Sequence, residues 1–429
     1  MPNLCILTNF REWNDAHSLT HVVRNQALTL AKHGHDVTVF TVEGCPAQSH
    51  DFPWHYRFDS CIPDFVPRPY TSLKELSEDH TQYASRLSQI LIDRLSDFDA
   101  VLTHDWIALG HNLPLAEALR LASRDVKLAR IPFFHWIHST PNYGSFDWWN
   151  IHRYGKGKGI NNHKHKIVYP NKTDSDFVAL TFKGTPADVR VIPHVVDLRL
   201  YFDFLADTCA VIDELPGLMS AEFVQVYPAA VDRLKDKGLR QLILTFKALK
   251  QKGHSICLLI VDSWTGRGLK ENISDYQRII ERNGLTSQEI AFSSTLIDGK
   301  FPAGVPRRIL RELSQCSNVF VYPTRGEAFG LPLPETSLAS GALAVCNRNL
   351  PMMLEVGGGN GLYANFGSSE QQWKPENEKE YYGMLAHLIC ARAKQDDTFQ
   401  HRTFVRRSFN MEQVYREFYA GILEEGVRL

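Results

Sequence analysis

An alternation of short apolar runs with helical segments, present in both halves of the chain, constrains the fold most strongly. In the first half, the apolar run Leu4–Leu7 is followed by a helical pattern over His21–His33 and by a second run, Val37–Phe40. Such a strand–helix–strand unit joins parallel strands of one sheet. The later apolar runs are Phe223–Tyr227, Ile256–Val261, Ile290–Ser293, Val319–Tyr322 and Leu343–Cys346. We therefore predict an α/β fold with two Rossmann-like, doubly wound domains.

The length and composition agree with two globular domains. A chain of 429 residues is too long for one ordinary hydrophobic core, and 44% hydrophobic with 22% charged residues is typical of globular proteins. The formal net charge of -1 does not indicate a globally basic nucleic-acid binder. The most irregular stretch between the halves is Asp197–Ala221. We place the boundary there, which gives an N-terminal domain of residues 1–205 and a second domain of residues 206–405.

The cysteines and the N-terminus bear on the compartment. The eight cysteines include no CxxC pair, which favours a reducing compartment. The N-terminal sequence MPNLCILTNF is typical of a strand rather than a secretion leader, and no run of about 18 apolar residues is present. We expect a soluble cytoplasmic protein, with peripheral association with a membrane as the alternative.

Residues 319–345, VFVYPTRGEAFGLPLPETSLASGALAV, combine a strand, a glycine-containing loop and a short helix. Gly326 and Gly330 allow backbone N–H groups to approach a ligand closely. The helix is expected to begin near Pro334, and its positive N-terminal end favours a diphosphate. Ligands of open α/β sheets bind outside the carboxyl ends of the strands, which is where this loop is expected.

Two glutamates occur in this segment, Glu327 in the loop and Glu335 in the first turn of the expected helix. Their carboxylates are natural acceptors for the vicinal hydroxyls of a sugar or a ribose. In isolation, two glutamates at this spacing would be interpreted as solvated side chains. Their position in a glycine-containing loop after a buried strand favours a site for a sugar-nucleotide donor.

This segment resembles the signature of retaining glycosyltransferases of family four, P-S/T-x-x-E-x-F-G-L-x-x-x-E followed by a short helix that ends at glycine. Residues 191–197, VIPHVVD, are similar to the family's V-I-P-N-G-V-D, with His194 and Val195 in place of Asn and Gly. The resemblance implies the GT-B architecture, in which two Rossmann-like domains face each other across a cleft. It also implies that residues 406–429 form a closing helix that crosses back to the N-terminal domain. The matching positions are Pro323, Thr324, Glu327, Phe329, Gly330, Leu331, Glu335 and Gly341.

The resemblance assigns roles to the matching residues of the second domain. Glu327 would lie at the transferred sugar and act in catalysis, and Glu335 would bind the ribose. Backbone N–H groups from Phe329 to Leu331, including Gly330, would contact the sugar or the diphosphate. Phe329 would lie beside the sugar, whereas Gly330 and Leu331 would hold the diphosphate.

The family also places an arginine and a lysine beside the diphosphate, in the loop after the first strand of the second domain. Here that loop is Pro228–Gly238, and the candidates are Arg233 and Lys237. The spacing is four residues where the family commonly has five, so Lys235 is an alternative to Lys237. Fixed cations can neutralise the leaving diphosphate in place of a divalent metal. Since no D-x-D motif with apolar flanks occurs at a strand end, we expect no metal site and no cofactor.

In the N-terminal domain, the resemblance points to the ends of two strands. His138 follows the apolar run IPFFHWI, and the family has a catalytic-site histidine at this strand end. His135 is a less favoured alternative for that role, and a satisfied buried histidine is an equally good interpretation of either. The motif H-D-W ends at Trp106 and resembles the family's motif, which makes Asp105 and Trp106 candidates for the acceptor side.

The first loop departs from the family. Residues 16–21, AHSLTH, stand where the family usually has Gly-Gly, so side chains occupy space beside the expected phosphate and acceptor. Ser18 is the candidate acceptor-side residue in this loop. The resemblance therefore does not assign the acceptor pocket or the phosphate contact of this loop.

Taken together, these patterns predict a metal-independent, retaining glycosyltransferase that moves a hexose-type sugar from a UDP- or GDP-sugar to a hydroxyl group. Its acceptor would be a carbohydrate or a lipid-linked sugar. A nucleotide-sugar epimerase, a sugar phosphorylase or an inactive sugar-nucleotide-binding module are alternatives of other classes. A Rossmann dehydrogenase is disfavoured because no G-x-G-x-x-G motif follows the first strand.

A basic stretch in the N-terminal domain leaves a further acceptor open. Residues Arg153 to Lys172 contain several basic residues, with Tyr154 and Tyr169 among them. Contact with a polyanion would fit this composition, and a hydroxylated base in DNA is the alternative acceptor. A solvated charged loop is the favoured interpretation.

Overall fold

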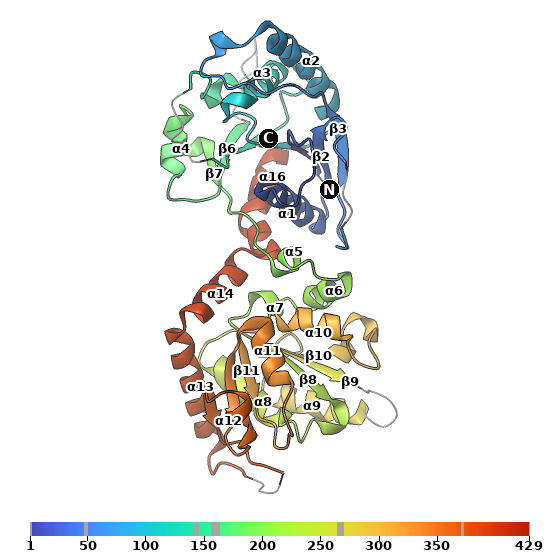
Figure 1. Ribbon diagram of the computed structural model, residues 1–429, viewed down its shortest axis with the longest axis vertical. Coiled ribbons are helices and arrows are strands. Elements are labelled where there is room, and N and C mark those ends of the chain that lie inside the picture. Colours follow the sequence, from blue (N-terminus) through green and yellow to red (C-terminus); the bar gives the residue numbers. More distant parts are fainter. Residues whose placement is uncertain are drawn as a thin grey trace. The chain divides into compact units, whose positions relative to one another are not determined.

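The computed structural model describes residues 2–46, 50–139, 146–155, 164–263, 270–369 and 373–428. The chain divides into two compact units (Figure 1). The first unit comprises Met1–His50, Trp54–Val196 and Met411–Leu429. The second unit comprises Asp51–Pro53 and Asp197–Asn410.

The first unit is built on a seven-stranded sheet in the order β3-β2-β1-β4-β5-β6-β7. All neighbouring strands are parallel. The order reverses between β1 and β4, so the topological switch point of this sheet lies at their carboxyl ends. The strands are β1 Asn3–Leu7, β2 Asp36–Val42, β3 Arg57–Ile62, β4 Ala100–His104, β5 Phe133–Trp136, β6 His165–Tyr169 and β7 Val189–Val191.

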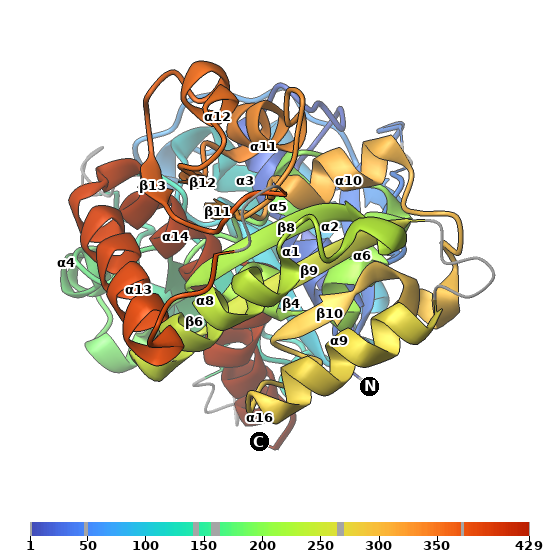
Figure 2. The same ribbon diagram turned by 90° about the horizontal axis from the view of Figure 1, so that it is seen from below.

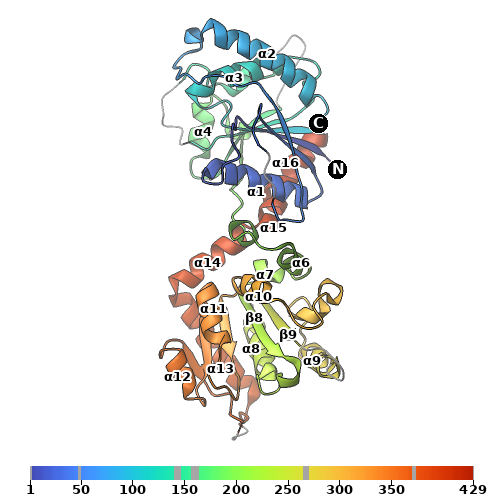
Figure 3. The same cartoon turned by 45° about the vertical axis from the view of Figure 1, so that its right-hand side comes forward.

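Helices cover both faces of this sheet. Figure 3 shows α2 and α3 on one face and α1 with the C-terminal helix α16 on the other. Val23, Ala27 and Leu30 have no exposed surface, and their helical spacing gives α1 the apolar face that packs on the sheet. The helices are α1 Ser18–Lys32, α2 Glu78–Leu95, α3 Leu113–Ala122, α4 Ser175–Thr181, α15 Met411–Val414 and α16 Ala420–Arg428, with a π-helical turn η8 at Tyr415–Tyr419.

The C-terminal segment is held in the first unit by polar and aromatic contacts with α1. Glu412 accepts hydrogen bonds from Lys32 and from His33 Nε2, the latter at 3.1 Å. The rings of His33 and Tyr415 stack with their centroids 3.7 Å apart. These contacts lower the pKa of Glu412 to about 2, chiefly through the hydrogen bond from His33.

The second unit contains two three-stranded parallel sheets, β10-β9-β8 and β11-β12-β13. Side chains join β8 to β11: Gln225 Nε2 donates to Val321 O and Gln225 Oε1 accepts from Val321 N, both at 2.9 Å. The six strands therefore lie side by side in the order β10-β9-β8-β11-β12-β13, as Figure 2 shows. The strands are β8 Phe223–Ala230, β9 Ile256–Ser263, β10 Ile290–Phe292, β11 Val319–Tyr322, β12 Leu343–Asn347 and β13 Leu362–Ala364.

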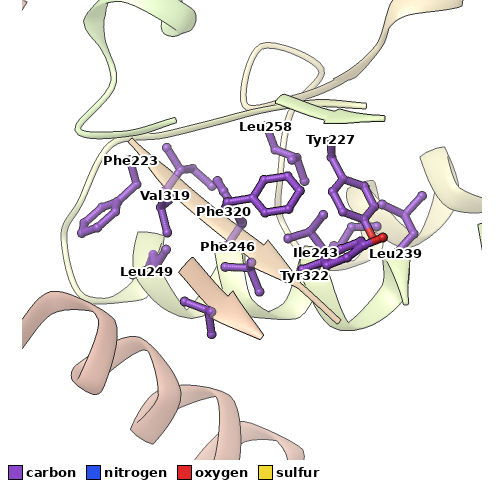
Figure 4. Packing of buried hydrophobic residues seen from close by; sticks show 14 of the residues in the cluster. Phe223, Tyr227, Leu239, Ile243, Phe246, Leu249, Leu258, Val319, Phe320 and Tyr322 are labelled. Atoms are coloured by element: carbon purple, nitrogen blue, oxygen red, sulfur yellow. The ribbon is translucent and has the colours of Figure 1, made fainter. Parts of the chain in front are cut away.

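Helices again cover both faces, with α8, α9 and α13 on one side of the strands and α10, α11 and α12 on the other (Figure 2). The apolar face of α8 packs with strands β8 and β11, where Phe246 and Phe320 are buried (Figure 4). The helices are α5 Leu198–Tyr201, α6 Ala206–Glu214, α7 Gly217–Ser220, α8 Leu239–Gln251, α9 Lys270–Arg282, α10 Arg307–Ser314, α11 Pro332–Ser340, α12 Met352–Val356, α13 Glu378–Gln395 and α14 Asp397–Ser408.

The α/β fold with two doubly wound, Rossmann-like units is confirmed, and local expectations need two corrections. The stretch Asp197–Ala221 is not irregular, because α5, α6 and α7 occupy most of it. Helix α11 begins at Pro332 rather than near Pro334, so proline occupies the first helical position in the structure as well. The expected domain bounds, the closing role of residues 406–429 and a cleft between the domains stay predictions. None of the described helices is long and apolar enough to cross a bilayer.

Candidate functional site

Two loops of the second unit meet at the switch point of its strand order, where β8 and β11 are neighbours. One loop follows β8 and ends at Gly238, and the other follows β11 from Pro323 onward. Gly238 has a left-handed conformation with φ of 70°, and a Cβ there would lie 2.3 Å from Pro323 O. Only glycine permits this close approach, which fixes the two loops against each other.

Glu327 is the centre of the polar contacts between these loops. Lys237 Nζ forms an ion pair with Glu327 Oε1, and both side chains are about nine-tenths buried. Tyr322 Oη donates a hydrogen bond to the same carboxylate oxygen at 3.0 Å, and Thr324 Oγ1 lies 3.4 Å from it. The structure thus brings together Glu327 and Lys237, which are 90 residues apart in sequence. Lys235, the alternative cation, is exposed.

Two buried tyrosines support this pair. Tyr227 Oη donates to Lys237 O at 2.6 Å, which fixes the backbone of the lysine. Burial raises the pKa of Tyr227 and Tyr322, and the negative charge of Glu327 raises both further. Both phenols therefore remain protonated donors at neutral pH, so the carboxylate of Glu327 is held by a neutral donor and a cation.

The loop after β11 presents a buried glycine between exposed apolar side chains. Gly330 has φ of 77°, and a Cβ there would lie 3.1 Å from the ring of Tyr322. Phe329 is 53% exposed and Leu331 is 57% exposed, so both flank the buried Gly330 on the surface. Arg233 is exposed, and its Nη2 donates to Gly326 O at 3.4 Å, which places it beside this loop.

Glu335 lies in the first turn of α11, as expected, but has partners of its own. Arg307 Nη2, at the start of α10, donates to Glu335 Oε1 at 2.6 Å. Glu335 also lines a cavity of about 550 Å³ between α10 and α11. The other lining residues are Arg307, Arg308, Leu310, Arg311, Ser314, Leu338 and Ala339. Within the described residues, no hydrogen bond or ion pair joins Glu335 to the group around Glu327.

In the first unit, His138 and Asp105 are held together at the ends of β5 and β4. His138 N donates to Asp105 Oδ1 at 3.0 Å, and Asp105 N donates to Trp136 O at 3.0 Å. Burial raises the pKa of Asp105 to about 6, and the hydrogen bond from His138 N opposes that rise. Asp105 also adopts a positive φ of 54°. The carboxylate therefore has a clear structural task, which is to tie the two strand ends together.

The other candidates of the first unit differ in accessibility. Ser18 is exposed and is the first residue of α1. Trp106 has no exposed surface and packs within the hydrophobic core, so it does not face an acceptor. His135 is also fully buried, between Thr103 at 2.9 Å and His165 at 3.0 Å, whereas His138 retains some exposed surface. The structure therefore favours His138 over His135 as a residue that a ligand can reach.

The basic stretch Arg153 to Lys172 lies partly outside the described residues, because residues 156–163 are not described. Tyr154 and Tyr169 are 4% and 5% exposed, so neither ring is accessible to a polyanion beside the basic side chains. Lys166 Nζ pairs with Asp188 at 3.4 Å. The sequence alone did not show whether these tyrosines lie in the core or at the surface. Tyrosine has an apolar ring and a polar hydroxyl group, so it is suited to both places.

Sequence reasoning missed several residues that shape the site. Tyr322 and Thr324 contact Glu327 directly, and Asn347 Nδ2 donates to Thr324 O at 2.9 Å and to Gly367 O at 2.6 Å. A signal existed for Tyr322, since it is a polar-tipped residue at the last position of a buried strand. No sequence signal marked Asn347, whose role depends on the pairing of β11 with β12.

One family model matches a segment that lies mostly in the first unit. Residues 19–200 match the family model described as Glycosyltransferase Family 4, so this segment is a glycosyltransferase family 4-like domain. The match covers less than half of the chain. No curated protein sequence matches the chain.

Several solved glycosyltransferase structures are similar over the full length. The glycosyltransferase from Rickettsia africae ESF-5 is 14% identical, with 100% of this chain and 99% of that chain covered and a TM-score of 0.36. HepE from Anabaena in complex with UDP is 14% identical, with 99% and 100% covered and a TM-score of 0.32. Sucrose-phosphate synthase from Thermosynechococcus elongatus is 17% identical, with 99% and 97% covered and a TM-score of 0.32.

Proposed function

We propose that this protein is a retaining, metal-independent glycosyltransferase that transfers a hexose-type sugar from a nucleoside-diphosphate sugar to a hydroxyl acceptor. The observation that carries the proposal is the buried group of Lys237, Glu327 and Tyr322 at the carboxyl ends of β8 and β11. That position is the topological switch point, where open α/β sheets bind nucleotides. The family 4-like match of residues 19–200 supports the same class independently.

The charges at this group fit a donor with an anionic leaving group. Lys237 and Arg233 carry positive charge beside a loop whose Gly330 allows close backbone approach. As the bond between the anomeric carbon and the phosphate oxygen breaks, negative charge grows on the diphosphate. Fixed cations stabilise that charge more in the transition state than in the ground state. Glu327 would accept hydrogen bonds from sugar hydroxyls, and Glu335 from the ribose.

The proposed transfer proceeds by attack on the same face of the sugar from which the diphosphate leaves. The acceptor oxygen forms the new bond to the anomeric carbon while the old bond to the phosphate oxygen breaks. The acceptor proton passes to the departing phosphate oxygen, so atoms and charges balance without an added base. This course retains the configuration at the anomeric carbon, and the state between the two bonds resembles an oxocarbenium ion.

A binding screen followed by product analysis tests the proposal. We expect one or more of the UDP-, GDP-, ADP- and dTDP-sugars to raise the unfolding temperature, because a ligand at about 100 times its Kd adds about 2.7 kcal/mol of stability. The variant Glu327→Gln should keep binding and lose turnover. Glu289→Gln is the matched control, since Glu289 pairs with Lys250 at 2.6 Å near the start of β10, at the opposite end of the strands.

Product analysis with and without acceptor separates the remaining classes. With acceptor, a transferase yields the glycosylated acceptor with a retained anomeric configuration. Without acceptor, it hydrolyses the donor only slowly. An epimer of the donor would identify an epimerase, and dependence on inorganic phosphate would identify a phosphorylase. Absence of binding by all four donors, with the protein folded, would refute the proposal.

A further inference from the structure

A chain of buried polar side chains runs through the first unit and ends at His138. Gln26 Nε2, from α1, donates to Tyr419 Oη at 2.9 Å. The other end of the same amide, Gln26 Oε1, lies 2.8 Å from His104 Nε2, and His104 Nδ1 lies 2.8 Å from His138 Nε2. Gln26 and His104 are 2% and 0% exposed, so water does not compete for these contacts.

The imidazoles in this chain are neutral. Burial lowers the pKa of His104 well below its usual value, and neighbouring histidines lower it further. Burial also lowers the pKa of His138 to about 3, with His194 as the second cause. A neutral imidazole carries one N–H and one lone pair, so each ring can donate at one nitrogen and must accept at the other.

These constraints fix the direction of every hydrogen bond in the chain. Because Gln26 presents its carbonyl oxygen to His104, the proton of His104 must be on Nε2. The lone pair of His104 Nδ1 then accepts from His138 Nε2, which requires the proton of His138 on Nε2. His138 Nδ1 is left with a lone pair, and within the described residues no hydrogen bond is made to it.

We propose that Gln26 and His104 are positioning residues that hold His138 as the Nε2–H tautomer, so that His138 Nδ1 accepts a hydrogen bond from a substrate hydroxyl. This inference rests on the proposed function for the identity of the substrate. Two further contacts hold His138 in place, one on its ring and one on its backbone. His194 stacks on it with centroids 5.2 Å apart, and the backbone N–H of His138 is bound by Asp105 at 3.0 Å.

The histidine at position 194 gives this chain an environment of its own around His138. The family pattern has an asparagine there, whereas the imidazole of His194 stacks on His138 at an interplanar angle of 25°. Burial lowers the pKa of His194 as well, so the stack is between neutral rings. Stacking fixes the plane of the His138 ring, and the hydrogen bond to His104 fixes its proton on Nε2. The lone pair of His138 Nδ1 therefore points in one defined direction.

The tautomer is measurable without any substrate. In the full-length protein with ¹⁵N-labelled histidine, long-range ¹H–¹⁵N correlation spectra distinguish Nδ1–H from Nε2–H imidazoles, and the variant His138→Asn assigns the signal. We expect His138 to be the Nε2–H tautomer. In Gln26→Leu, His104 would leave a buried N–H unpaired, which costs more than an unpaired lone pair, so the chain should reverse and His138 should become Nδ1–H.

Thr103→Val is the matched control, because Thr103 binds buried His135 at 2.9 Å in the same sheet and has no part in the chain. Its His138 signal should be unchanged. If Gln26→Leu does not fold, Tyr419→Phe removes the acceptor of Gln26 Nε2 at the far end and should raise the Nδ1–H fraction of His138. An Nδ1–H tautomer in the wild type, or a His138 signal that neither variant of the chain changes, would overturn the inference.

Activity separates this inference from the proposed function. With a donor identified, Gln26→Leu should lower kcat/KM about tenfold to hundredfold, the range typical for residues that orient a catalytic-site group. The affinity for the free nucleoside diphosphate should not change, since that ligand lacks the transferred sugar whose hydroxyl His138 would bind. If the tautomer result holds but no nucleotide sugar binds, the proposed function fails while the positioning chain stands. If donors turn over and Gln26→Leu is fully active, the positioning role fails alone.

Discussion

The stability of the first unit should depend steeply on pH, because it contains largely buried, neutral histidines, among them His104, His135, His138 and His165. Burial lowers the pKa of His135 and His138 to about 3, and those of His104 and His165 well below the usual value. In the unfolded chain each imidazole has a pKa of about 6.5. Folding must therefore release their protons at acid pH. The contribution of these residues to stability is complete above pH 6.5 and is lost as the pH falls below it.

The magnitude follows from proton linkage. Between pH 7 and pH 5, His135 and His138 each cost about 2 kcal/mol of folding free energy, since their native pKa lies below the whole interval. Asp105 acts in the opposite direction, because its pKa is raised to about 6 by burial, and it recovers about 1 kcal/mol on acidification. The net loss from these three residues is about 3 kcal/mol, and His104 and His165 add to it in the same direction, so the loss is a large fraction of the total stability of a typical domain.

Urea unfolding followed by tryptophan fluorescence measures this loss, since six of the eight tryptophans lie in the first unit. With a slope of about 2 kcal/mol per molar urea, the midpoint should fall by at least about 1.5 M between pH 7 and pH 5. His135→Gln should reduce the loss by about 2 kcal/mol. His401→Gln, at an exposed position of the second unit, should leave it unchanged. The reasoning would be refuted if the urea midpoint fell by less than the amount that a single buried histidine would produce.

Three further predictions concern the second unit. Glu327→Gln should lower turnover at least about 100-fold, measured as product formation. Its free energy of unfolding should also fall, because Lys237 keeps a buried positive charge without a carboxylate partner. Gly238→Ala should lower the unfolding free energy by at least about 2 kcal/mol, since its Cβ would overlap a carbonyl oxygen at 2.3 Å. The control Gly383→Ala, whose Cβ would have no atom within 4 Å, should not destabilise the unit. Urea titration of both variants measures the difference. Arg307→Ala should release Glu335 and raise the affinity for ribonucleotides two- to fivefold, because an exposed ion pair contributes about 0.5–1 kcal/mol. Equal or weaker binding in calorimetry would contradict a ribose role for Glu335.

The central strands of both units could be predicted from the sequence because they are buried on both faces. Runs such as Val319–Tyr322 are continuously apolar, and β11 has those bounds. The strands that were missed include two that lie at sheet edges and are polar or short. Strand β3, Arg57–Ile62, is an edge strand with half-exposed polar residues, and β13, Leu362–Ala364, is a short strand at the other unit's edge. Edge strands are not buried on both faces, so they do not show the continuous apolar run that identifies a central strand.

The candidate site was predictable only as far as local sequence determines it. The loop with Glu327 is recognisable because glycines and a following helix occur at fixed spacing. The pairing of Glu327 with Lys237 depends on the close approach at Gly238, which brings two distant loops together. Glu335 was expected to share a ligand with Glu327, and its contact with Arg307 across two helices has no signature in the sequence.

Calorimetric titration with the nucleotide sugar that gives the largest thermal shift tests the central claim most directly. We compare the wild type with Lys237→Ala and with Glu289→Gln, whose ion pair lies at the opposite end of the strands. Loss of one charge-assisted contact to the diphosphate should weaken binding by about tenfold to hundredfold in Lys237→Ala, and Glu289→Gln should bind within about twofold of the wild type. Equal affinity of all three proteins would contradict the assignment of the donor site to the ends of β8 and β11.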